Sequence, residues 1–244
     1  MDLGGQEQHN GLLVALAHDL RYPLDLIRQL SSEIKIANQI NSSRPIDHRA
    51  IEQLYLTTDY LVEITKSLEY IANLESGLVE VSPLQLNNLF SDIKQANLGL
   101  AKELKQSPRY EIPKYKKIVV NSNYRVLKSI LLGLTRDAMR YGRNKKSVCL
   151  RARIYQKQKV LLTVADDGVD LSERNIFEIK TNILNGNFEP VSNRPLTSSL
   201  NLLLADKLTE LLGGRMAIKS GRRNGLVVGI SLPASRQLSL INNK

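Results

Sequence analysis

A histidine followed directly by a carboxylate stands near the start of the chain, in a segment with the apolar spacing of a helix. The pair is His18 and Asp19. A neutral imidazole nitrogen is a competent nucleophile, and an adjacent carboxylate can accept the other ring N–H and fix the reactive tautomer. Because His18 lies beside the apolar stripe rather than in it, we expect the side chain to be accessible to a partner protein.

The elements that carry this pair are two predicted helices. Apolar residues recur every three or four positions over residues 12–40, with Pro23 as a bend, and again over residues 47–75, with Gly77 as the stop. Two long amphipathic helices cannot bury both apolar stripes against each other alone. We therefore predict a four-helix bundle built from two chains.

The pattern changes after Gly77 to short strands alternating with separate helices, which is typical of an α+β sandwich. The predicted strands mostly pair as hairpins, and the loop at 177–196 lacks periodicity. The expected elements are strands at 79–81, 110–112, 118–120, 148–155, 160–165, 215–219 and 226–232, helices at 84–104, 123–141 and 200–212, and a loose tail beyond 233.

Composition places the chain among ordinary globular proteins. Of 244 residues, 42% are hydrophobic and 24% are charged, and there is no run of 18 apolar residues and no secretory signal. The single cysteine and three scattered histidines have no zinc-ligand spacing, so we expect a reducing, cytoplasmic location. The net charge of +10 favours acidic partners. No recognised DNA- or RNA-reading motif accompanies the basic residues, so we expect no nucleic-acid partner.

The stretch ALAHDLRYPL, residues 15–24, resembles the H-box of bacterial two-component histidine kinases, whose usual form is AHELRTPL. Further matches follow in the family's order at residues 73–77, 83–86, 211–215 and 232–233. The resemblance implies a dimerisation and phosphotransfer hairpin over 1–77, which forms a dimeric four-helix bundle. It also implies a degenerate ATP-binding domain of the GHKL (Bergerat) type over 78–233, and a tail over 234–244.

The same resemblance gives roles to the H-box residues. It implies that His18 is phosphorylated and that Asp19 assists it. Tyr22 stands where the family usually has Thr, whose side chain helps to orient the water that removes phosphate from the partner. Without that Thr, the resemblance implies reduced phosphatase activity. Tyr22 can equally be a helix-surface aromatic that packs on the partner.

The ATP site of the family is partly retained. By resemblance, Asp166 matches the carboxylate that reads adenine, and Gly168 is kept. Asp137 replaces the asparagine that holds Mg²⁺, and a carboxylate can still ligate that ion. Arg140 keeps a cation for the phosphates, and Tyr141 keeps the ring that lies against the base.

Other positions of that site depart from the pattern. Gly133 replaces a second asparagine, and Asp170, Ser199 and Asn201 replace three glycines. Ser199 and Asn201 fall at the helix start whose backbone N–H groups cradle phosphates in the family. Phe177 matches the family's F-box phenylalanine and can equally be a core aromatic.

Three hypotheses follow. The first is a histidine kinase that uses ATP and Mg²⁺ to phosphorylate His18 and passes the group to an aspartate of a response regulator receiver domain. The second is a histidine phosphotransferase or pseudokinase that shuttles phosphate between receiver domains without ATP. The third is a non-catalytic basic scaffold. The regulator, the signal and the choice between cis and trans phosphorylation lie beyond the sequence.

Overall fold

The computed structural model describes residues 20–21, 23–36, 48–113, 118–141, 148–155, 159–168, 181, 197–221 and 225–235, with backbone alone at 48, 141 and 197–199. Residues 23–36 are helical, and α2 (His48–Glu75) is the second long helix. Gly77 has a φ of +68°, and the backbone N–H groups of Gly77 and Leu78 donate to Leu74 and Asn73. This is a Schellman stop, as the glycine predicts.

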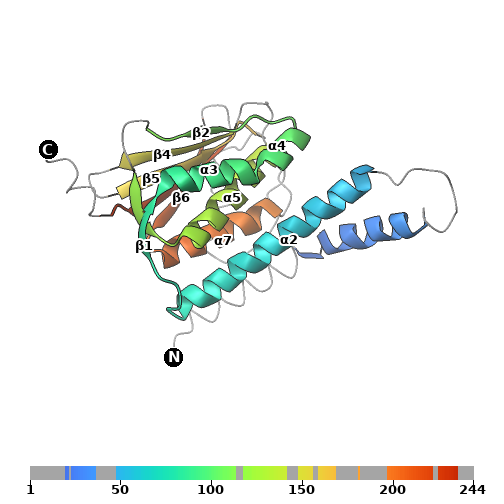
Figure 1. Ribbon diagram of the computed structural model, residues 1–244, viewed down its shortest axis with the longest axis horizontal. Coiled ribbons are helices and arrows are strands. Elements are labelled where there is room, and N and C mark those ends of the chain that lie inside the picture. The colour runs from blue at the N-terminus through green and yellow to red at the C-terminus, as the bar shows by residue number, and fades with distance from the viewer. Residues whose placement is uncertain are drawn as a thin grey trace.

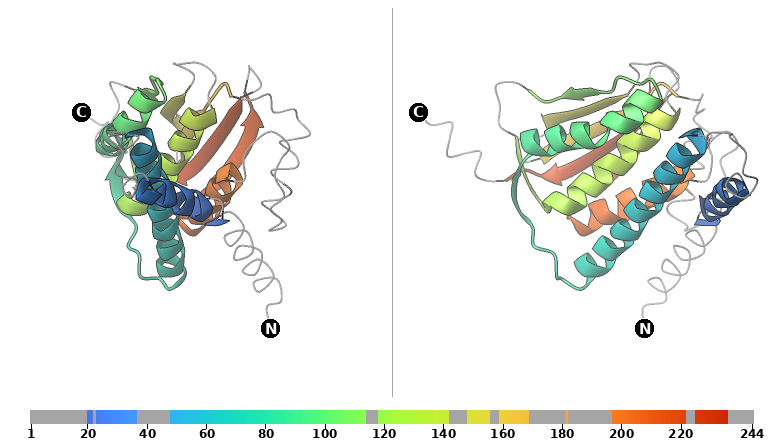
Figure 2. Two further views of the ribbon diagram at one scale, coloured as in Figure 1. Left: turned by 90° about the vertical axis from the view of Figure 1, so that its right-hand side faces the viewer. Right: turned by 45° about the vertical axis from the view of Figure 1, so that its right-hand side comes forward.

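A five-stranded sheet forms one layer of the remaining part, and helices cover one of its faces (Figures 1 and 2). Its strand order is β2-β4-β5-β7-β6, and every neighbouring pair is antiparallel except β2 with β4. The strands are β2 (Arg109–Glu111), β4 (Cys149–Tyr155), β5 (Lys159–Ala165), β6 (Arg215–Ser220) and β7 (Leu226–Pro233).

Three helices pack their apolar sides on this sheet: α3 (Leu86–Ala96), α5 (Tyr124–Tyr141) and α7 (Thr197–Leu211). Asn123 begins α5 as its N-cap, because its side-chain oxygen accepts hydrogen bonds from the N–H groups of Arg125 and Val126. The core between the layers contains Leu127, Leu131, Leu162 and Leu208, all essentially inaccessible to solvent. The α+β sandwich is therefore confirmed.

One face of α2 packs on α5 and α7 (Figure 1). Tyr60, Ile64, Ser67 and Ile71 are buried on it, and their spacing of three or four residues puts them on one side of the helix. Ile64 and Ile71, two residues of the stripe predicted to face the four-helix bundle, are instead buried against α5 and α7 of the same chain. The two-chain bundle itself stays a prediction. No helix among the described residues is both long and apolar enough to cross a membrane.

Two predicted elements after Gly77 are wrong. The first strand is β1 (Ser82–Gln85), which pairs antiparallel with β3 (Val119–Ser122), and residues 79–81 are not a strand. Pro83 lies inside β1 rather than opening a helix, because proline is tolerated at the edge of a two-stranded pair. The expected helix at 84–104 is divided at Asn97 into α3 and α4 (Leu98–Glu103).

The first residues of the predicted tail are also held in place. Ala234 bridges to Val120, and the N–H of Ser235 donates to the carbonyl of Val119. Ser235 is buried as a result. Residues 236–244 lie outside the described part of the chain.

Candidate nucleotide site and its contacts with helix α2

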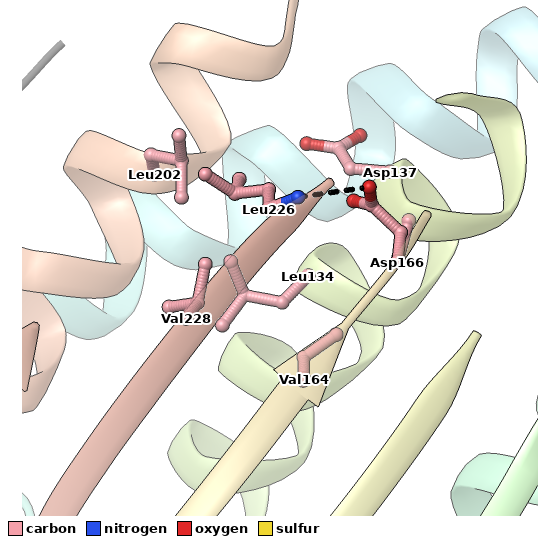
Figure 3. A pocket seen from close by; sticks show the side chains of 8 residues that line it. Leu134, Asp137, Val164, Asp166, Leu202, Leu226 and Val228 are labelled. Atoms are coloured by element: carbon pink, nitrogen blue, oxygen red, sulfur yellow. Dashed lines mark hydrogen bonds between the residues drawn. The ribbon is translucent and has the colours of Figure 1, made fainter. Parts of the chain in front are cut away.

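Asp166 lies just beyond the end of β5 and is joined to the start of β7. Its Oδ1 accepts a hydrogen bond from the N–H of Leu226 at 3.1 Å (Figure 3) and another from the N–H of Gly168 at 2.8 Å. The N–H of Asp166 also donates to the carbonyl of Leu226. Two backbone segments 60 residues apart are therefore fixed to one carboxylate.

Gly225 lets these segments come together. A Cβ on Gly225 would collide with the carbonyl oxygen of Asp166 and would lie 2.7 Å from the Cα of Asp167. Only glycine fits where two backbones approach this closely. The sequence signal for this requirement is the Asn-Gly pair that opens the last strand.

Asp137 and Asn201 form a direct pair across two helices. The Nδ2 group of Asn201, on α7, donates to Oδ1 and to Oδ2 of Asp137, on α5, at 2.9 Å each. Asp137 is 6% exposed, so its carboxylate is satisfied by protein groups rather than by bulk water. The two residues were expected to face a nucleotide, and in the structure they bind each other.

Gly133 completes this arrangement. A Cβ at Gly133 would lie 3.9 Å from Oδ1 of Asn201, so the absent side chain at 133 leaves the space that the Asn201 side chain borders. Gly133, Asp137 and Asn201 thus lie together in one cluster, in which Asn201 contacts the other two.

Arg140 links this cluster to α2. Its Nη1 lies 3.7 Å from Oδ1 of Asp137, and its guanidinium carbon lies 5.3 Å from the centre of the Tyr60 ring. The second distance is within the range of a cation–π contact. The cation expected to meet phosphate charge therefore contacts a carboxylate on its own helix and an aromatic ring on α2.

The cavity between Asp137 and Asp166 is small. Its remaining lining consists of apolar side chains from α5, α7, β5 and β7 (Figure 3). It measures about 10 Å³, roughly the room that one water molecule needs. The lining residues are Leu134, Ala138, Val164, Leu202, Leu226 and Val228.

Three further polar contacts join α2 to α5 and α7. Asp59 forms an ion pair with Arg136, with 2.7 Å between Oδ2 and Nη1, and the side chain of Arg136 is only 15% exposed. Ser67 and Ser129 share a buried hydrogen bond of 3.0 Å between their hydroxyl oxygens. Lys207 pairs with Glu75 at 3.2 Å near the end of α2. Sequence reasoning missed these contacts, although the spacing of Arg136 and Arg140 places both cations on one side of α5.

Known proteins similar to this chain are sensor kinases. No protein-family model matches the chain. The Heme sensor protein HssS of Staphylococcus saprophyticus is 25% identical over 221 residues, which cover 88% of this chain and 45% of the relative. The chain thus spans about half the length of that relative.

Solved structures reproduce the arrangement of the elements. The histidine kinase AdeS of Acinetobacter baumannii matches with a TM-score of 0.60 at 14% identity, over 90% of this chain and 98% of that one. The catalytic domain of histidine kinase ThkA matches with a TM-score of 0.51 at 19% identity, over 64% of this chain and 96% of that domain. The fold is that of a sensor histidine kinase core.

Five of the expected site residues come together in this fold. Asp137 and Asp166 line the small cavity. Asn201 and Arg140 contact Asp137, and the N–H of Gly168 donates to Asp166. Tyr141 and Ser199 are described only as backbone, at the end of α5 and the start of α7. The predicted residues that lie outside the described part of the chain are His18, Asp19, Tyr22, Asp170 and Phe177.

Among the described residues, the carboxylate that the resemblance assigns to Mg²⁺ is bound by another side chain. Mg²⁺ needs oxygen lone pairs at about 2.0–2.1 Å in an octahedral shell. Both oxygens of Asp137 instead receive an amide donor, and the adjoining cavity has room for roughly one water. Nowhere in the described ranges do three or more His, Cys, Asp or Glu side chains gather in a way that could hold a metal ion.

Proposed function

We propose that this chain is a histidine phosphotransfer protein of a two-component system. His18 exchanges a phosphoryl group with an aspartate of a response regulator receiver domain, and ATP is not the source of that group. The observation that carries the proposal is the pair of hydrogen bonds from Asn201 to both oxygens of Asp137. A nucleotide-dependent kinase would need this carboxylate and the space beside it for the metal and the phosphates.

The exchange is a reversible substitution at phosphorus. A ring nitrogen of neutral His18 attacks the phosphorus of the receiver's aspartyl phosphate, the acyl P–O bond breaks, and the carboxylate leaves. Asp19 accepts the N–H of the other ring nitrogen and stabilises the positive charge that develops on the imidazole. The reverse step returns the phosphoryl group to a second receiver.

A homodimer in the cytoplasm is part of the same proposal. The side chains of Leu24, Ile36, Ile51, Tyr55 and Val62 are 43–69% exposed, and all five lie on the two long helices. Clusters of exposed apolar side chains are typical of interaction surfaces. The face of α2 that remains after packing on α5 and α7 thus fits a second copy in a four-helix bundle.

The test is to follow labelled phosphate. Receiver domains charged with labelled acetyl phosphate are mixed with the chain, and a parallel sample receives Mg²⁺ and γ-labelled ATP. We expect acid-labile, base-stable label on the chain from the receiver and none from ATP. His18→Gln is the matched control and should remain unlabelled. Label on His18 from ATP would establish the kinase hypothesis instead.

A further inference from the structure

The face of the five-stranded sheet that points away from α3, α5 and α7 is strongly cationic. Alternate residues of each strand point to opposite faces, and the strand registers fix which residues share a face. In Figure 2 the described helices all lie on the other side of the sheet. We call the side of the sheet opposite the helices the outer sheet face. It consists of the odd-numbered positions of the five strands: 109 and 111 of β2, 149 to 155 of β4, 159 to 165 of β5, 215 to 219 of β6 and 227 to 233 of β7.

Every lysine and arginine of these five strands lies at an outer position. They are Arg109, Arg151, Arg153, Lys159, Arg215 and Lys219, and all six are exposed. The five strands contain a single acidic residue, Glu111. Its carboxylate is bound by Arg151 at 2.6 Å and by Arg109 at 3.3 Å. The five strands thus place six cations and one carboxylate on this face, which has a marked excess of positive charge.

Four of the six cations form two rows that flank a floor without charged side chains; Arg109 lies outside them on β2, and Lys159 stands at one end of the floor, at the start of β5. Arg151 and Arg153 line one side on β4, and Arg215 and Lys219 line the other side on β6. The register runs from Arg153 through Leu161 and Ser231 to Arg215. Three strand spacings separate the two arginines, which corresponds to about 14 Å.

The floor between the rows consists of small or apolar residues on β5 and β7. Leu161 and Thr163 are half-buried, and Gly229 has no side chain. A Cβ on Gly229 would lie 3.5 Å from Leu161 Cδ1, so the leucine covers the glycine and flattens the surface. A neutral centre with a charged rim is the usual anatomy of a protein–protein interface.

The distance between the two rows of cations indicates what kind of partner segment can lie between them. An α-helix with its side chains is about 10–12 Å across and fits between rows about 14 Å apart. A helix with an apolar stripe can lie on the floor while carboxylates on its two flanks meet the two rows of cations. Single-stranded nucleic acid is held by aromatic stacking platforms in addition to charge. The floor offers no ring, since the sole aromatic residue at the outer positions of β4, β5, β6 and β7 is Tyr155, at the margin.

We propose that the outer sheet face docks an acidic amphipathic helix of a partner protein, lying along β5 and β7 between the two rows of cations. The site is on the opposite side of the sheet from α2 and from the Asp137–Asn201 pair. It therefore stands independently of the phosphotransfer function.

The test uses a designed, fluorescently labelled helical peptide with a Leu/Ala stripe flanked on both sides by Glu, and a scrambled peptide of the same composition. Binding to the full chain is measured by anisotropy at about 0.15 M salt. We expect the helical peptide to bind at least tenfold more tightly than the scrambled one. Arg153→Glu with Arg215→Glu should remove this preference.

The matched control has the same change in net charge on the other side of the molecule. Lys94→Glu with Lys102→Glu alters exposed residues of α3 and α4, and should change binding of the helical peptide less than twofold. Arg153→Ala with Arg215→Ala serves as a milder pair, and circular dichroism verifies that each variant is folded.

Three results would overturn the proposal. Equal binding of helical and scrambled peptides would show general attraction to a basic protein. An equal loss in the Lys94/Lys102 control would place the binding elsewhere. Displacement of the helical peptide by a 20-nucleotide oligo(dT), with the same dependence on Arg153 and Arg215, would show a nucleic-acid surface.

Discussion

Asn201 donates its side-chain amide to both carboxylate oxygens of Asp137, at 2.9 Å each. The two residues come from α7 and α5 and are 64 positions apart in the chain. By the resemblance, the amide stands where the family usually has a glycine, and the carboxylate stands where it usually has an asparagine. The structure thus places a side-chain contact in the region where the resemblance implies metal and phosphate.

The first prediction concerns the chemistry of this pair. Asn201→Asp would put two carboxylates in contact inside a buried site, and we expect a loss of about 2–3 kcal/mol in the free energy of unfolding at pH 7. The loss should shrink near pH 5, because one proton shared by the two carboxylates removes the repulsion. Chemical denaturation at both pH values measures it.

The control for that variant is the reversed pair. Asp137→Asn combined with Asn201→Asp restores one amide and one carboxylate, and should recover most of the stability lost in the single variant. A single Asn201→Asp variant as stable as the parent at pH 7 would show that the hydrogen bonds are not important to the fold.

A second prediction concerns the ion pair between α2 and α5. Asp59 and Arg136 are partly buried, with side-chain exposures of 32% and 15%. Exposed ion pairs contribute about 0–1 kcal/mol, and breaking a fully buried pair costs about 3–5 kcal/mol. For this partly buried pair we expect a coupling free energy of about 1–2 kcal/mol. A double-mutant cycle with Asp59→Asn and Arg136→Gln, followed by urea unfolding, gives this quantity.

Glu63 and Lys66 provide the comparison within the same helix. Their ion pair is 3.3 Å long and more exposed, so its coupling should stay below about 0.5 kcal/mol. Equal coupling in the two cycles would contradict the view that the contact between α2 and α5 is a structural interface.

These two cases show what sequence reasoning could and could not reach. The ends of α2 and α5 were predictable because Gly77 and Asn123 act on their own neighbours. The contacts of Asp137 are not predictable in this way, because its partner Asn201 lies on another helix, 64 positions away in the chain. The same holds for the apolar stripe of α2, because helical periodicity does not say which neighbour covers Ile64 and Ile71.

A third prediction tests the close approach at Asp166. Gly225→Ala should cost at least about 3 kcal/mol or prevent folding, because the added methyl group collides with the backbone of Asp166 and Asp167. Gly229→Ala is the control, since its Cβ would have no neighbour closer than 3.5 Å, and it should change stability by less than about 1 kcal/mol. Thermal unfolding compares the two variants, and a well-folded Gly225→Ala protein would refute the contact.

A fourth prediction is a pH dependence at Asp206 on α7. Burial, and then the nearby Glu210, raise the pKa of the Asp206 carboxyl. The ionised form therefore costs stability above the folded-state pKa, and the cost disappears below the unfolded-state pKa of about 3.9, where the group is protonated in both states. Asp206→Asn should stabilise the protein at pH 7, by an amount that vanishes as the pH falls below about 4. A stabilisation that is equal at pH 3.5 and pH 7 would rule out ionisation as its cause.

We propose that the ATP-binding-like domain does not take nucleotide, and calorimetry of the unmodified chain with Mg²⁺ and ATP up to millimolar concentration tests this. The closed pair of Asn201 with Asp137 predicts no saturable heat. Binding with a millimolar or lower Kd that is lost in Asp166→Ala would contradict the account, and would return His18 to the role of an ATP-loaded residue.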